Sequence, residues 1–193
     1  MGNAAKMTKM TEREKMLAGQ LYRIDDPELK AMRGRCYRLL DELNATSNGD
    51  KPRRREILEQ LLGGIGERVN LKSGFFCDYG LNIFLGDDVF VNVNCVFLDC
   101  ARIEIGDGTL LGPQVGLYAV THPLDATERA TGREWGEPII IGKNCWIGGH
   151  ATVNPGVTLG DNTVVASGAV VTKSFPEGNV LLAGVPARVI REL

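Results

Sequence analysis

Residues 141–173 read IGKNCW IGGHAT VNPGVT LGDNTV VASGAV VTK when written in sixes, which shows a regular repeat. An aliphatic residue opens each group, and the residue four positions later is small or β-branched. The first set is Ile141, Ile147, Val153, Leu159, Val165 and Val171, and the second is Cys145, Ala151, Val157, Thr163 and Ala169. Neither a helix, with a period of about 3.6 residues, nor a strand, with a period of about two, produces a six-residue repeat. A hexapeptide period is typical of a parallel β-helix.

A triangular coil explains this period. If three short strands form one turn of the coil, each side uses six residues, the aliphatic residue points inward, and Gly or Asn accommodates the bend. One coil cannot bury its apolar side alone, whereas a stack of coils can. Shorter runs with the same spacing come earlier, at Leu85, Val91 and Phe97 and again at Ile105, Leu111 and Leu117. An ordinary sandwich would repeat every 8–12 residues. We therefore predict a mainly-β fold, with a β-helix over residues 67–182.

The region before the repeats, residues 11–66, is predicted to be helical. Thr11 stands three residues ahead of Glu14, as in a capping box, and Asp26 precedes Pro27, as at a helix N-terminus. A third helix contains the run Arg53-Arg54-Arg55, which we interpret as a solvated helix face. Residues 1–10 are expected to be a flexible N-terminus, and residues 183–193 a C-terminal segment.

Composition excludes several classes of protein. The chain has 193 residues, 44% of them hydrophobic and 24% charged, with a net charge of -2, which favours neither nucleic acid nor an anionic membrane as partner. The sequence contains no apolar run of membrane-span length and no signal peptide, so we expect a cytoplasmic protein. The five cysteines form no CxxC pair, which predicts buried free thiols and no metal site.

The interruption of the repeat is the candidate functional region. After Leu117 the hexads stop until Ile139 or Ile141, and the polar segment 118–138 must leave the coil as a loop. At its root stands His122, one of two histidines in the chain. Catalytic residues are often carried by loops on rigid scaffolds. Glu134, on the same loop, is a candidate for orienting the imidazole.

Several motifs together carry a family resemblance. They are EKMLAGQLYR (14–23), CDYGLNIFLG (77–86), THP (121–123), CWIGG (145–149) and AGVPARVIREL (183–193). In these the chain resembles the hexapeptide-repeat acetyltransferases of the maltose, galactoside and Nod-factor O-acetyltransferase branch, and most of all the maltose type. The resemblance implies a left-handed β-helix, a homotrimer with its active site between chains, and transfer of acetyl from acetyl-CoA to a sugar hydroxyl.

The resemblance also implies roles for single residues. His122 matches the catalytic general base, and Asn92 matches the residue that stabilises the transition state. Asp78 and Asp99 match positions that bind the acceptor. Asp25 or Asp26 matches a third such position, and the alignment with the family fits either residue. Cys100 stands where the galactoside enzymes have an aspartate, which argues against a galactoside acceptor. The positions for acetyl-CoA are Trp146, Gly149, Ser167, Thr172, Lys173, Arg188 and Arg191.

Other functions remain open alternatives. A non-catalytic hexapeptide-repeat scaffold would be expected to lose the THP, VNVN and CWIGG motifs, which are all present. An acetyltransferase for serine or for a xenobiotic would use the same coil with a different acceptor. A carbonic anhydrase needs three histidines for its zinc, and this chain has two. The sequence does not identify the acceptor.

Overall fold

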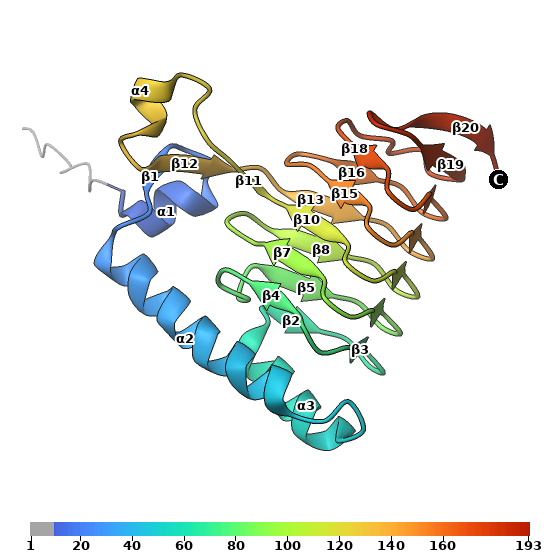
Figure 1. Ribbon diagram of the computed structural model, residues 1–193, viewed down its shortest axis with the longest axis horizontal. Helices are drawn as coiled ribbons and strands as arrows, with labels where there is room; N and C mark the ends of the chain where they lie inside the picture. The colour runs from blue at the N-terminus through green and yellow to red at the C-terminus, as the bar shows by residue number, and fades with distance from the viewer. Residues whose placement is uncertain (1–9) are drawn as a thin grey trace, which may run out of the picture.

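The structure, a computed structural model, describes residues 10–193. Its main body is a stack of triangular coils whose sides form three parallel sheets (Figure 1). The first face consists of β2 (Gly64–Ile65), β5 (Ile83–Leu85), β8 (Ile103–Ile105), β13 (Ile139–Ile141) and β16 (Thr158–Leu159). The second face consists of β3 (Asn70–Leu71), β6 (Phe90–Val91), β9 (Leu110–Leu111), β14 (Trp146–Ile147), β17 (Val164–Val165) and β19 (Val180–Ala183). The third face consists of β4 (Phe76–Cys77), β7 (Val96–Leu98), β10 (Gly116–Tyr118), β15 (Thr152–Val153) and β18 (Val170–Val171).

The last strand departs from this pattern. Strand β20 (Arg188–Glu192) pairs antiparallel with β19 at the end of the second face. The earlier strands of the three faces all pair in parallel, so the structure confirms the mainly-β prediction and the β-helix.

The six-residue register is confirmed in the coil interior. The six aliphatic residues from Ile141 to Val171 are at most 1% exposed, as are the small residues four positions after them. Positive φ angles also recur every six residues, at Asn144, His150, Gly156, Asn162 and Gly168. These are the corner positions, where Gly and Asn tolerate a backbone conformation that costs most other residues energy. The sequence period therefore records both the packing and the bends.

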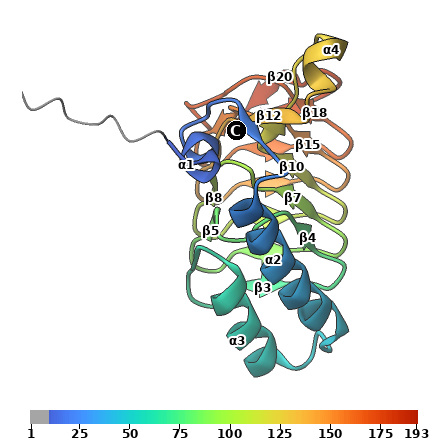
Figure 2. The same ribbon diagram turned by 90° about the vertical axis from the view of Figure 1, so that its left-hand side faces the viewer.

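Three helices precede the coil, as predicted. Helix α1 (Glu12–Leu17) begins with the Thr11–Glu14 capping box, and α2 (Pro27–Ala45) begins with Asp26 accepting hydrogen bonds from two backbone N–H groups. Helix α3 (Lys51–Leu61) is capped by Asp50. Helices α2 and α3 lie beside the first coils (Figure 2) and contribute buried residues to the same apolar core, among them Leu40, Leu43, Ile57 and Leu61.

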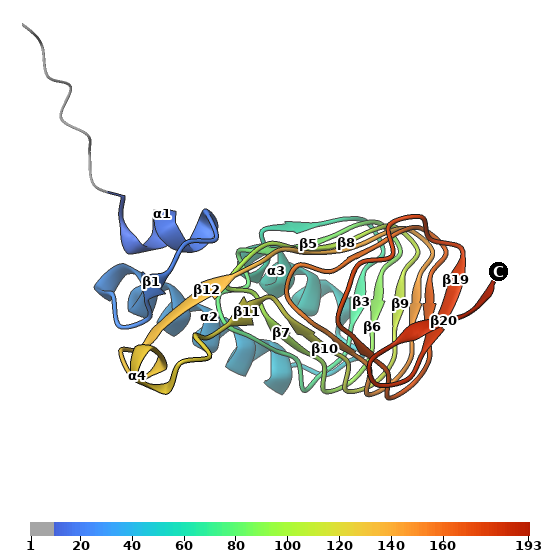
Figure 3. The same cartoon turned by 90° about the horizontal axis from the view of Figure 1, so that it is seen from above.

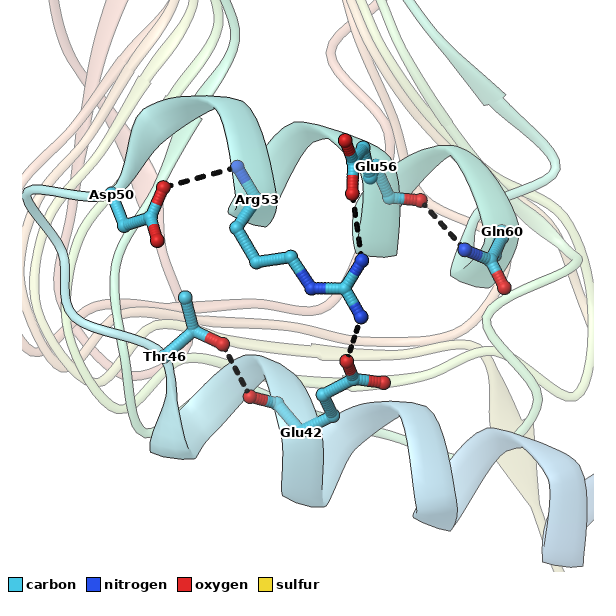
Figure 4. Close-up of polar contacts among 6 residues, drawn as sticks. All are labelled: Glu42, Thr46, Asp50, Arg53, Glu56 and Gln60. Carbon is cyan, nitrogen blue, oxygen red and sulfur yellow. Dashed lines mark hydrogen bonds and ion pairs between the residues drawn. The ribbon is translucent and has the colours of Figure 1, made fainter.

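The arginine run of α3 corrects one expectation. Arg53 is exposed and bridges the two helices, with ion pairs to Glu42 and Glu56 (Figure 4). Arg54, however, is only 5% exposed, and its guanidinium donates to the carbonyl oxygens of Leu43, Thr46 and Leu71. These carbonyls lie near the end of α2 and in the first coil. The run is therefore not a uniform solvated face, because its middle residue ties the helices to the coil.

The segment expelled from the coil is an ordered hairpin. Strand β11 (Val120–Thr121) pairs antiparallel with β12 (Arg133–Gly136), and the short helix α4 (Ala126–Arg129) lies between them. A two-residue strand near the N-terminus, β1 (Tyr22–Arg23), adds to the other side of β12. Figure 3 shows α1, β1 and α4 together at one side of the coil, with β12 running from α4 back toward it. Pairing with β1 therefore gives the loop a partner that its own polar sequence did not reveal.

The remaining sequence expectations concern cysteines, membranes and the N-terminus. All five cysteines are buried and free, as predicted. Among residues 10–193, no helix combines the length and the apolar character needed to cross a bilayer. The expected flexible N-terminus, residues 1–10, lies outside the described residues except for Met10.

Candidate active site

One corner of the prism gathers several of the candidate residues, among them His122. The loop edge, as we name it, is the corner between the third and first faces. It carries Asp78 after β4, Cys100 after β7, the hairpin after β10, Asn154 after β15 and Thr172 after β18. These five positions lie on successive coils, because each follows a strand of the third face. The coil thus stacks residues that are far apart in the sequence along one line.

His122 lies where the hairpin leaves this edge. Its side chain is 50% exposed and follows directly after β11. It lines a shallow cavity of about 360 Å³ together with Thr121, Leu124, Trp135, Glu137, Asn154, Pro155 and Thr172. A half-exposed imidazole at the mouth of a cavity can reach a bound hydroxyl, which is the geometry that a general base requires.

The Glu134 carboxylate lies behind this imidazole. Its Oε2 is 3.6 Å from His122 Nε2, and the residue is only 8% exposed. The other oxygen, Oε1, accepts a hydrogen bond from the Tyr22 hydroxyl and lies 3.6 Å from the Cys100 sulfur. A carboxylate placed in this way stabilises an imidazolium and fixes the orientation of the ring. The arrangement supports the expectation that Glu134 orients His122.

Asp78 is the second carboxylate at the loop edge. Its Oδ2 lies 3.6 Å from the Cys100 sulfur, so the thiol stands between Asp78 and Glu134. Burial raises the pKa of Asp78 and the negative charge of Glu134 adds to this, while the Cys100 thiol and Arg33 act in the opposite direction. Burial and the two carboxylates also raise the pKa of Cys100, which keeps it a neutral thiol. The sulfur therefore has one hydrogen to share between two acceptors.

Asp99 lies in a buried position that an acceptor ligand would not be expected to occupy. The residue is fully buried, and its Oδ1 accepts from the backbone N–H groups of Asp78 and Tyr79. Its Oδ2 accepts from the backbone N–H of Asn82. Burial raises the pKa of Asp99 to about 7, partly offset by these backbone donors. Because Asp99 has no exposed surface to offer a sugar, we leave it out of the acceptor site and assign it to holding the backbone behind Asp78.

The structure distinguishes Asp25 from Asp26, the two alternatives for an acceptor-binding carboxylate, by the partners that each already has. Asp26 caps α2 and uses its carboxylate on the N–H groups of Glu28 and Leu29. Asp25 is exposed and pairs with Arg23 at 2.8 Å. Asp25 is therefore freer to change partners, since a surface ion pair is worth little.

Asn92 lies at another corner of the prism. It follows β6, between the second and third faces, and we name this corner the Asn92 edge. Gly149 and Ser167 lie at the same edge on later coils, after β14 and β17. Within one chain a strand of the third face separates this edge from the loop edge. The structure therefore does not bring Asn92 together with His122 in a single chain.

The other expected acetyl-CoA positions are divided in the same way. Thr172 and Lys173 lie at the loop edge, while Trp146, Arg188 and Arg191 lie on the second face and its last strand. Trp146, Val164, Leu181 and Arg191 are in register across four neighbouring strands. The Trp146 indole is 56% exposed and lies on the outer side of that face, since Ile147 beside it is buried.

Comparison with known proteins places this geometry in a family. The maltose acetyltransferase hexapeptide capping motif matches residues 15–66, and a hexapeptide repeat of succinyl-transferase matches residues 138–173. The nodulation protein L of Rhizobium meliloti is 43% identical over 179 residues, which cover 93% of this chain and 97% of that protein. A maltose O-acetyltransferase from Clostridium difficile 630 superposes with a TM-score of 0.93 at 44% identity, covering 95% of this chain and 98% of the other. The chain belongs to the maltose O-acetyltransferase family.

A further solved structure concerns the co-substrate of a relative. A hexapeptide-repeat acetyltransferase from Vibrio cholerae O1 biovar eltor, complexed with acetyl coenzyme A, superposes with a TM-score of 0.89 at 38% identity. It covers 95% of this chain, and 99% of that protein is matched. This chain is thus an acetyltransferase of the maltose O-acetyltransferase family, with family resemblance along nearly its whole length.

Two residues of this acetyltransferase escaped the sequence analysis. Tyr22 contacts Glu134 from 112 positions away, and Arg33 of α2 donates to the Tyr79 hydroxyl at 2.6 Å. Tyr22 belongs to the motif EKMLAGQLYR, which signalled the family but not this contact. Only the pairing of β1 with β12 identifies it.

His122 does not line the larger cavities of the acetyltransferase. One of about 490 Å³ is bounded by α3 and the first coil, and one of about 660 Å³ lies behind the hairpin, beside Phe84 and Arg102. Four basic residues line the first of these, Lys51, Arg54, Arg55 and Arg68, and the last two already pair with Glu59 and Asp88. The chemistry therefore points to the shallow cavity at His122. Among residues 10–193, no three His, Cys, Asp or Glu side chains cluster as metal ligands would.

Proposed function

We propose that this chain transfers the acetyl group of acetyl-CoA to a hydroxyl group of a sugar, with His122 as general base. The observation that carries the proposal is the half-exposed His122 imidazole, backed by Glu134 and open to a cavity that also contains Thr172. Family membership supplies the acetyl transfer. The acceptor class and the residue assignments are our proposal.

The proposed reaction is direct transfer. A sugar hydroxyl gives its proton to the unprotonated imidazole nitrogen while its oxygen attacks the thioester carbonyl carbon. The tetrahedral intermediate then collapses, the carbon–sulfur bond breaks, and the imidazolium returns the proton to the CoA thiolate. Glu134 lies where it favours the imidazolium that exists between these two steps. No acyl-enzyme intermediate is required.

Asn92 is proposed to stabilise the oxyanion from a neighbouring subunit. Its side-chain oxygen accepts from the N–H of Val93 at 2.8 Å, which turns the amide NH₂ away as a donor. A donor aimed at a developing oxyanion is among the larger contributions to catalysis. Because His122 and Asn92 lie at different edges of one prism, a site that uses both must combine two chains. We propose that three chains form a closed ring, a homotrimer, with one such site at each of the three contacts between chains.

The acetyl-CoA site is proposed to extend along the same contact between subunits. Lys173 at the loop edge and the exposed Arg188 and Arg191 supply cations for the phosphates. Trp146 supplies an exposed aromatic surface, and Gly149 and Ser167 lie at the Asn92 edge beside it. This division over two edges is what a site between chains would require.

The acceptor is proposed to lie toward the first coils, where Asp78 stands. A carboxylate there can accept hydrogen bonds from sugar hydroxyls, and Asp25 or Asp26 can do the same from the N-terminal region. The Cys100 thiol is a weaker hydrogen-bonding group than the aspartate of the galactoside enzymes. We therefore favour a maltose- or glucose-like acceptor.

The experiment is an acceptor panel assayed by release of free thiol from acetyl-CoA. We expect turnover with maltose or glucose and little with serine or chloramphenicol. His122→Ala should lower kcat by roughly 10²- to 10⁴-fold, as loss of a general base does, and leave the affinity for CoA nearly unchanged. His150→Asn is the control, because His150 is the chain's other histidine and lies at an exposed corner with a φ of 59°, which asparagine tolerates.

Three outcomes would contradict the proposal. Wild-type turnover by the His122→Ala variant would show that His122 is not the general base. A panel in which serine or chloramphenicol alone is acetylated would replace the sugar by that acceptor, and no turnover with any acceptor would favour the scaffold.

A further inference from the structure

The contact between Tyr22 and Glu134 joins the N-terminal segment to the hairpin. Tyr22 is fully buried, and its hydroxyl donates to Glu134 Oε1. The backbones of the two residues face each other in the antiparallel pairing of β1 with β12. The position of this hydroxyl is therefore fixed by both packing and strand register, and it does not depend on a flexible side chain.

The two oxygens of the Glu134 carboxylate have different partners. The Tyr22 hydroxyl and the Cys100 thiol both approach Oε1, whereas Oε2 lies 3.6 Å from His122 Nε2. Donors that hold one oxygen set the rotation of the whole carboxylate and so direct the other oxygen to the imidazole. The hydrogen bonds to Oε1 thus set the position of Oε2 relative to the His122 imidazole.

Tyr22 is the stronger of the two donors. The Cys100 thiol is a weak donor and has Asp78 Oδ2 as a second acceptor at 3.6 Å. The Tyr22 hydroxyl donates to Glu134 Oε1, and the Cys100 sulfur lies beside the same hydroxyl. Burial, followed by the neighbouring Cys100 and Glu134, raises the pKa of Tyr22, so the hydroxyl keeps its proton as a donor.

We propose that Tyr22 is a positioning residue for the acetyl transfer, acting on His122 through Glu134. The inference rests on the proposed function, because it assumes that His122 is the base. It gives the N-terminal region, which includes the matched capping motif at residues 15–66, a function in the reaction in addition to covering the first coils. Strand β1 holds the catalytic hairpin in place, and its tyrosine aligns the carboxylate behind the histidine.

The test is Tyr22→Phe in the full chain, which keeps the buried ring and removes only the hydroxyl. We expect kcat to fall roughly 10- to 100-fold, the range that loss of a hydrogen bond to a charged group corresponds to. The KM for acetyl-CoA should not change, since Tyr22 lies away from the residues assigned to CoA. A purely structural role would instead lower the melting temperature and the amount of active enzyme, without a specific change in the pH profile.

The pH profile is the discriminating measurement. A well-aligned carboxylate favours the imidazolium, so its misalignment should move the acidic limb of the kcat profile to lower pH. The His122 ring resonance should show the same displacement of its titration midpoint, and the His150 resonance should not move. The other ionisable groups near this pair are Glu137 in the cavity, Asp78 and Cys100 at the loop edge, and Arg33 of α2. All of these remain in the variant.

Tyr79→Phe is the matched control. Tyr79 is also a buried tyrosine, 1% exposed, and belongs to the same small apolar cluster as Tyr22, but its hydroxyl bonds to Arg33. Its removal should not move the His122 midpoint. In a Glu134→Gln background, Tyr22→Phe should have no further effect on that midpoint, because the residue through which it acts is already changed.

Several outcomes would overturn the inference. An unshifted His122 midpoint in Tyr22→Phe would do so, as would equal shifts in Tyr22→Phe and Tyr79→Phe. A Tyr22→Phe chain that fails to fold while Tyr79→Phe folds would assign the hydroxyl to stability alone. The two proposals can fail separately: full turnover by His122→Ala defeats the proposed function, whereas the resonance titration reports on Tyr22 without any turnover.

Discussion

At the scale of single residues, the orientation of one amide makes a mechanistic prediction. Asn92 uses its oxygen on the N–H of Val93, which leaves the NH₂ as the group that can donate to an oxyanion. Aspartate has nearly the same shape but no donor when ionised. Asn92→Asp should therefore lower kcat by roughly 10²- to 10³-fold with little change in the KM for acetyl-CoA.

Steady-state kinetics with Asn94→Asp as control would check this prediction. Asn94 is in the same turn, is exposed, and has a φ of 59°, which aspartate tolerates. If both variants keep the wild-type kcat, Asn92 is not the oxyanion donor. If both lose activity equally, the turn rather than the amide is responsible.

At the scale of the element, each six-residue side divides into interior and corner positions with opposite requirements. Val153 is fully buried and Asn162 is an exposed corner with a φ of 57°. A carboxylate at Val153 would be buried without a partner and should cost several kcal/mol, comparable to the stability of a typical domain. We expect Val153→Asp to be unfolded or insoluble and Asn162→Asp to melt close to wild type.

Thermal melts followed by circular dichroism would distinguish the two variants. Equal melting temperatures for both would mean that the assigned register is wrong. Leu159→Asp offers an independent interior position on the next side of the coil, where the residue is 1% exposed.

At the scale of the whole molecule, the site is predicted to require two chains. His122→Ala and Asn92→Ala should each be nearly inactive alone. When equal amounts are unfolded and refolded together, a site works only if His122 comes from one variant and Asn92 from the other. Random assembly of a ring should therefore restore about a quarter of the wild-type sites, which is one half times one half.

A second mixture provides the control. His122 and Glu134 lie 3.6 Å apart in one chain, so His122→Ala mixed with Glu134→Ala should restore nothing beyond the Glu134→Ala level. Light scattering would establish the oligomer in each sample. A mixture of re-formed trimers that stays inactive, or a stable and fully active monomer, would contradict a site between chains.

The coil and the helices before it could be predicted from the sequence alone, although the first strand of the coil, β2, begins at Gly64, inside the segment expected to be helical. Every hexad meets the same local demand, an aliphatic residue inside and a residue that tolerates the bend at the corner, so the pattern repeats and is readable without any long-range information. The caps at Thr11 and Asp26 were readable for the same reason, because a cap involves neighbours in the chain. The motif at the root of the interruption likewise pointed to His122 before its surroundings were known.

How the candidate residues come together depends on the tertiary fold. Asp99 carried the charge of an acceptor ligand, yet folding buries it beneath three backbone N–H groups. Arg54 belonged to a surface-like run, yet it binds carbonyls between the helices and the coil. Tyr22 meets Glu134 across 112 residues because β1 pairs with a hairpin that the coil itself expels. Such contacts join residues that are far apart in the sequence. Their positions depend on the path of the whole chain between them, which no local sequence pattern encodes.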